Sequence, residues 1–262
     1  MTAALLFAVA ATVLPIIPTG FAPAVEPDYR FSRPMRAGQT LSIGNIDGAV
    51  TVTRASGGTA VVLVTKRVIR GDGNLVQAIL EEESGGRIKV CTVYLRTAGE
   101  QRDSCDGRNS NGRRREPLEV EMTYAVQLPA GVELNVGTVD GDVIVSGLAA
   151  RATVATVDGD IRVEGRAPER VSTVDGDIEV RATGELPEQL HFSTVDGGVL
   201  LSLPAGAGFE VNATTIDGEL ESDFPITVQG RWGPRSLRGT VGDGRTTIRI
   251  STVDGDVAIR RQ

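Results

Sequence analysis

The residues best suited to chemistry in this sequence are aspartates, and they recur within one short pattern built around an Asp-Gly pair. The pattern T-V-D-G-D occurs at residues 138–142, 156–160, 173–177 and 252–256, with looser copies at 45–49, 194–198 and 215–219. Its first aspartates are Asp47, Asp140, Asp158, Asp175, Asp196, Asp217 and Asp254. A row of carboxylates could bind a hard cation, act in pairs in glycoside hydrolysis, or form structural turns.

The structural interpretation has the simplest physical basis. Glycine adopts positive φ at no steric cost, and an aspartate side chain accepts a hydrogen bond from a nearby backbone N–H. Neither the nonapeptide repeat of calcium-binding β-rolls nor the closing glutamate of an EF-hand loop is present. We therefore predict a structural turn ladder, with a weak calcium site as the first alternative and catalytic carboxylates as the second. We expect no metal, no cofactor and no catalytic residue.

The segments around each motif predict what positions these aspartates. Apolar residues alternate with polar ones on both sides, as in Leu134 and Val136 before Asp140 and Val143 and Val145 after it. Alternation with period two indicates a strand on each side of the turn. Because the copies recur at intervals of about twenty residues, the sequence predicts an all-β parallel β-solenoid with coils of 17–21 residues. A run of ordinary hairpins is the alternative.

The N-terminal part is less regular. Residues 60–68, 87–95 and 118–128 are predicted to be longer strands that cap the stack, and residues 75–83 a short helix. Residues 97–116 form a polar inserted loop. We expect one domain over residues 25–262.

Export is predicted by two features. Residues 1–24 contain no charged side chain and include an apolar run of the length found in signal peptides, although the usual basic start is missing. An uncleaved anchor and a buried segment are the alternatives. Cys91 and Cys105 are predicted to form a disulfide, with free thiols as the alternative, because two cysteines without a nearby histidine cannot complete a zinc site. The protein should then be periplasmic, cell-surface or secreted.

Two loops are candidates for ligand binding. The only tryptophan, Trp232, lies near Arg231, Arg235 and Arg238, and could stack on a sugar ring or cap the end of the solenoid. The inserted loop contains Arg113, Arg114 and Arg115, which could bind acidic glycans or associate peripherally with anionic lipid, or lie solvated. The single histidine, His191, is predicted to point outward from a strand.

The serial T-V-D-G-D copies, the segment V-Q-L-P-A-G-V-E-L-N-V-G at 126–137 and the segment G-T-V-G-D-G-R-T-T-I-R-I at 239–250 resemble the bacterial putative-adhesin domain family of unknown function. The resemblance runs from about Leu41 onward. It implies a β-solenoid that is exported or membrane-anchored. No catalytic residues are established for that family, and the inserted loop departs from its pattern.

The sequence therefore predicts an exported, non-catalytic binding module that engages envelope polysaccharide or a protein partner. A carbohydrate-active β-helix enzyme is the first alternative, and an envelope scaffold or stress-response accessory protein the second. The net charge of −7 argues against a nucleic-acid partner, since binding to phosphates requires a basic face.

Overall fold

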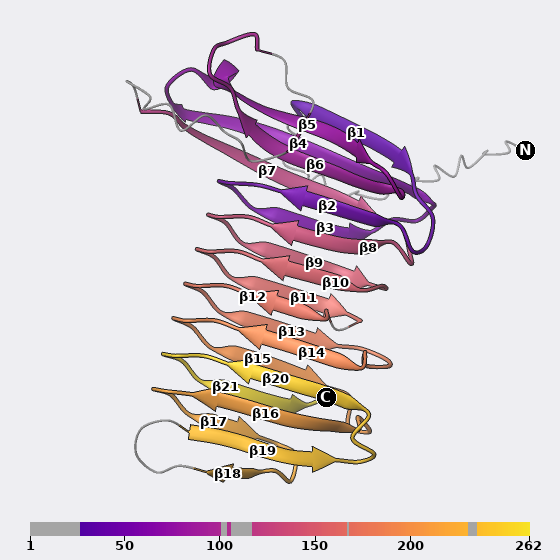
Figure 1. Cartoon of the computed structure of the whole chain (residues 1–262), viewed down its shortest axis with the longest axis vertical. Coiled ribbons are helices and arrows are strands. Elements are labelled where there is room, and N and C mark those ends of the chain that lie inside the picture. Colours follow the sequence, from indigo (N-terminus) through magenta and orange to yellow (C-terminus); the bar gives the residue numbers. More distant parts are fainter. Residues whose placement is uncertain (1–26, 101–103, 106–116, 167, 230–234) are drawn as a thin grey trace, which may run out of the picture.

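The computed structural model describes residues 27–100, 104–105, 117–166, 168–229 and 235–262. Two sheets face each other and form a tall stack of coils (Figure 1). The described residues contain no α-helix, and one 3-10 turn, η1 (Gly73–Leu75), precedes β5. The predicted all-β solenoid is confirmed.

Each sheet is a continuous series of hydrogen-bonded strands. Sheet 1 has ten strands, in spatial order Tyr29–Pro34 (β1), Thr59–Arg70 (β4), Glu119–Leu128 (β7), Val50–Arg54 (β3), Val143–Leu148 (β9), Ile161–Gly165 (β11), Ile178–Ala182 (β13), Val199–Leu203 (β15), Val257–Arg261 (β21) and Leu220–Ser222 (β17). Sheet 2 has eleven strands, in spatial order Thr227–Gln229 (β18), Arg235–Val241 (β19), Phe209–Thr215 (β16), Thr246–Ser251 (β20), Gln189–Ser193 (β14), Arg170–Ser172 (β12), Ala152–Ala155 (β10), Glu133–Gly137 (β8), Thr40–Gly44 (β2), Arg87–Tyr94 (β6) and Val76–Glu83 (β5).

Each coil consists of one strand in sheet 2, an Asp-Gly corner and one strand in sheet 1. Successive coils pair in parallel, so that Ile161 of β11 lies between Val143 of β9 and Ile178 of β13. On the facing sheet, Val171 of β12 pairs with Phe192 of β14. These inward side chains are almost completely buried and form continuous aliphatic columns, which explains why the apolar pattern repeats with the coils.

The last coil does not stack at the end. The aspartate corners lie in the order 47, 140, 158, 175, 196, 254 and 217, so the β20–β21 coil sits between the β14–β15 and β16–β17 coils. Figure 1 shows the yellow coil in this position. The free edge of β16 is taken by β19, which pairs antiparallel and is itself covered by β18. Strand β20 therefore pairs with the opposite edge of β16 and lies between β16 and β14.

Long strands cap the N-terminal side, as predicted. In sheet 1, β4 has 12 residues and β7 has 10, and they pair antiparallel. The helix predicted for residues 75–83 is wrong, because this segment is η1 followed by strand β5. The segment forms a strand because it pairs with β6. In this conformation Val76 and Ala78 enter the main core, while Ile79 on the other face packs near Cys91.

Several predictions lie outside the described residues. These include the signal peptide at 1–24 and most of the inserted loop at 97–116. In the described part of the chain, no helix is long and apolar enough to cross a membrane.

Candidate functional site

The corner motif is held by hydrogen bonds between coils. The threonine of each motif is buried, and its hydroxyl lies 3.0–3.2 Å from the carbonyl oxygen of the motif glycine in the neighbouring coil; this holds for Thr156, Thr173, Thr194, Thr215 and Thr252. The hydroxyl satisfies a carbonyl that would otherwise be buried without a partner. This contact explains why threonine recurs at the same offset.

The first complete motif departs from this rule. Thr138 is buried, yet its hydroxyl has no hydrogen-bond partner among the described residues. The equivalent acceptor in the neighbouring coil, the Gly48 carbonyl, already accepts a bond of 2.8 Å from the side-chain amide of Asn45. Asn45 stands where the other motifs have threonine, so the Gly48 carbonyl is bonded by the side chain of its own motif and not by Thr138.

The motif glycines are required by close approach as well as by conformation. Gly159 and Gly176 have φ of 147° and 145°, in the region that side-chain-bearing residues avoid. A Cβ added to Gly176 would lie 2.1 Å from the carbonyl oxygen of Gly159. Only glycine lets adjacent coils stack at this corner.

The first aspartates form the predicted ladder along the corner. They bridge in parallel from coil to coil, and those from Asp140 onward are exposed to water. Loss of hydration and the neighbouring carboxylates of Asp196 and Asp158 raise the pKa of Asp175. Burial, followed by the charges of Asp140 and Glu121, raises the pKa of Asp47. In the part of the chain that the structure describes, no group of three or more His, Cys, Asp or Glu side chains converges on a metal-sized site.

The second aspartate of the motif has a defined role that the sequence did not reveal. Its carboxylate accepts a hydrogen bond of 2.7–2.9 Å from the backbone N–H at the same position of the next coil, as seen for Asp142, Asp160, Asp177 and Asp256. Gly198 has no carboxylate and interrupts this series. The predicted turn ladder therefore consists of two rows, one solvated and one bonded to backbone donors.

A row of basic side chains on the outer face of sheet 2, the cation row, was not predicted from the sequence. Arg170 (β12), His191 (β14) and Arg249 (β20) are register partners on three adjacent strands. The row then crosses β16, where Asn212 occupies this position, and reaches Arg238 on β19. The prediction that His191 points outward is consistent with its half-buried position on this face. The row could have been found in the sequence, because Arg170, His191 and Arg249 each lie five residues before a motif aspartate.

The cation row borders a groove along sheet 2. One depression is lined by Arg170, His191 and Arg249, and a second by residues of β2, β6 and β8. Both are lined by Arg151, Thr153 and Glu169, so together they form one elongated groove across the coils. A groove that crosses several strands fits a ligand extended along the axis of the stack.

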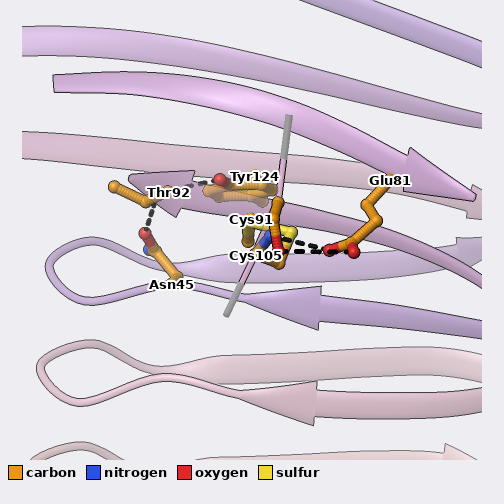
Figure 2. The surroundings of a disulfide bond; sticks show 7 residues. Asn45, Glu81, Cys91, Thr92, Cys105 and Tyr124 are labelled. Carbon is orange, nitrogen blue, oxygen red and sulfur yellow. Dashed lines mark hydrogen bonds between the residues drawn. A yellow bond between two sulfur atoms is a disulfide. The ribbon is translucent and has the colours of Figure 1, made fainter. Parts of the chain in front are cut away.

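The N-terminal end of sheet 2 is locked by a disulfide. Cys91 on β6 is bonded to Cys105, as predicted, and the bridge covers a small apolar cluster of Ile79, Val93 and Leu95. The Glu81 carboxylate accepts a 2.6 Å hydrogen bond from the Cys105 backbone N–H (Figure 2).

Beside the disulfide lies a buried polar network that serves the fold. The Thr92 hydroxyl donates to the side-chain oxygen of Asn45 and lies 2.8 Å from the hydroxyl of Tyr124 (Figure 2). Burial raises the pKa of Tyr124, so its hydroxyl remains protonated. The network joins the N-terminal cap to the first coil.

The loop residues predicted to bind ligand are only partly visible. Arg235 and Arg238 lie on β19. The other five candidates, Trp232, Arg231, Arg113, Arg114 and Arg115, lie outside the described residues.

Stacked strand–corner–strand coils, sealed by a long-stranded cap, define a parallel two-sheet β-solenoid. The chain belongs to the Toastrack DUF4097 family, whose model matches residues 39–260, and the resemblance drawn from the motifs is confirmed. No curated protein sequence matches it.

Solved structures with a related outline share little sequence. A "putative cell adhesion protein" from Clostridium sporogenes has 8% identity and a TM-score of 0.43, over 89% of this chain and 99% of that one. A "putative adhesin" from Bacteroides fragilis has 12% identity and a TM-score of 0.30, over 90% and 99%. A "putative lipid binding protein" from Parabacteroides distasonis has 10% identity and a TM-score of 0.20, over 91% and 99%.

Proposed function

We propose that this protein is an exported, non-catalytic binding module of the cell envelope that holds an extended polysaccharide along the groove of sheet 2. The observation that carries the proposal is the groove itself, which crosses several in-register strands and is lined by polar and charged side chains. A rigid, regularly spaced surface costs little conformational entropy on binding, which suits a repetitive polymer.

Export is supported by the Cys91–Cys105 bond, because structural disulfides persist in oxidising compartments. The absence of catalysis is supported by the way the carboxylates are used. Those of Asp142, Asp160 and Asp177 bind backbone N–H groups of the fold. The first aspartates form one row along the corner of the coils, and none of them lines the groove of sheet 2.

The test is binding of the purified chain to a panel of neutral and acidic envelope polysaccharides, measured by affinity electrophoresis. We expect retardation by at least one polymer, and loss of retardation when Thr153 in the middle of the groove is replaced by Trp. Replacement of Thr51 on the outside of sheet 1 by Trp is the matched control. Absence of binding to every polymer would refute the proposal, and release of new reducing ends would show an enzyme instead.

A further inference from the structure

The exposed arginines of the two sheets include some that are paired with carboxylates and some that are not. On sheet 1, Arg162 contacts Glu179, and Arg260 contacts Glu221 and Asp223. On sheet 2, among the residues described, Arg170, Arg249 and Arg238 have no carboxylate within 4.0 Å. The register partners of these arginines are His191, Asn212 and threonines, so no carboxylate stands opposite them across the strands.

The depression around this row is positive. Its cationic side chains are Arg151, Arg166, Arg170 and Arg249, and its acidic side chains are Glu169 and Glu188, which leaves two positive charges in excess before His191 is counted. Arg151 is occupied, because it contacts Glu133 and lies 3.9 Å from Glu169. The arginines of this row without a carboxylate partner are therefore Arg170 on β12 and Arg249 on β20, on either side of His191.

We propose that Arg170, His191 and Arg249 bind carboxylates on successive units of an acidic polysaccharide. This inference rests on the proposed function and names the ligand class of the same groove. Adjacent members of the row are separated by one strand spacing, about 4.8 Å, and the row from Arg170 to Arg238 spans about 19 Å. Guanidinium groups present a planar fork of donors that matches a carboxylate.

His191 adds a dependence on pH. Burial and the flanking charges of Arg170 and Arg249 lower its pKa, so the imidazole is neutral in the free protein at neutral pH. A bound carboxylate favours the protonated form and raises this pKa, so binding takes up a proton. The affinity therefore rises as the pH is lowered from the pKa of His191 in the complex to its lower pKa in the free protein. Below the pKa of the free protein, His191 is protonated in both states and the affinity rises no further.

A polysaccharide fits better than a nucleic acid. The net charge is −7, and the ladder of exposed aspartates runs along the corner of the same coils. The exposed large apolar side chains in the described residues are all aliphatic, so the described part of this surface offers no exposed aromatic platform on which bases could stack.

The experiment measures binding of three probes: polygalacturonate, the same polymer with its carboxylates methyl-esterified, and single-stranded DNA. The chain is compared with Arg170→Gln/Arg249→Gln and with the control Arg54→Gln/Arg181→Gln, which removes the same charge from exposed positions of sheet 1. We expect the sheet 2 variant to bind polygalacturonate at least about tenfold more weakly, the control variant to bind normally, and the esterified polymer to bind poorly.

The pH arm uses His191→Gln. Affinity of the unmodified chain for polygalacturonate should increase from pH 8 to pH 5, and the variant should lose most of that increase. Equal binding of the esterified polymer, or equal loss in both double variants, overturns the acidic ligand while leaving the proposed function intact. Tighter binding to DNA overturns the polysaccharide class. Failure of every polymer, neutral or acidic, overturns the proposed function itself.

Discussion

Two threonines of the same motif should respond in opposite ways to the same substitution. Thr173 and Thr138 are 5% and 6% exposed, and both occupy the first position of T-V-D-G-D. The Thr173 hydroxyl lies 3.2 Å from the Gly159 carbonyl oxygen, whereas the Thr138 hydroxyl has no partner among the described residues. Substitution by valine keeps the β-branched shape and removes only the hydroxyl.

The expected magnitudes follow from these contacts. Thr173→Val leaves a buried carbonyl without its donor, which costs about 1–3 kcal/mol of unfolding free energy, and the added methyl group offsets up to about 0.8 kcal/mol. Thr138→Val removes an unsatisfied polar atom from the core, so it should be neutral or stabilising by about 1 kcal/mol. The two variants should therefore differ by about 2 kcal/mol at the centre of these ranges.

Urea denaturation followed by far-ultraviolet circular dichroism measures this difference, and thermal melting should separate the variants by roughly 5–10 °C. Identical changes for both variants would refute the argument, since they would show that the motif selects threonine for its shape alone. Thr194→Val is a second test of the bonded class, because its hydroxyl also lies 3.2 Å from a glycine carbonyl.

Four further outcomes are expected. Gly176→Ala should destabilise the chain by more than about 2 kcal/mol in denaturant titration, because its Cβ would lie 2.1 Å from a backbone oxygen; an unchanged midpoint contradicts this. Reduction of the Cys91–Cys105 bond, which closes a separation of 14 residues, should lower the unfolding free energy by about 3 kcal/mol, and the double serine variant should match it. Because loss of hydration and the neighbouring carboxylates raise the pKa of Asp175, the native state holds that proton more tightly than the unfolded chain, and the resulting stability is present in acid and lost as the pH rises through the native pKa. Asp175→Asn should therefore raise the melting temperature more at pH 7 than at pH 3, and equal shifts would count against the ladder repulsion. Millimolar calcium should leave the melting temperature unchanged, whereas a rise of several degrees would show that the aspartate ladder binds cations.

The periodic features of the fold could be predicted because each coil repeats the same local conditions. Alternating apolar residues on both sides of an Asp-Gly pair indicate strand, turn and strand, and their recurrence indicates stacking. The disulfide was predictable from the two cysteines alone. The segment at 75–83 was not, because L-V-Q-A-I-L-E-E-E is compatible with a helix until β6 offers a strand edge with which it can pair.

The candidate site in the groove was not predicted from the sequence for a related reason. The most unusual residues of the sequence occur in the segments around Trp232 and Arg113, which interrupt the repeat. The cations of the groove are single residues within ordinary strands, and each looks like a normal outward-facing side chain. Only the alignment of coils in register makes Arg170, His191 and Arg249 neighbours.

The coil could be inferred from the amino-acid pattern, because the threonine, the aspartates and the glycine of each motif act within a corner whose geometry is nearly the same every time. The tertiary structure alone decided the order of the coils. Asp254 follows Asp217 in sequence but is placed between Asp196 and Asp217 in space. The strand edges of similar coils are nearly interchangeable locally, so the choice depends on which edge β19 has already occupied. That choice also makes β20 the neighbour of β14, and so brings Arg249 beside His191.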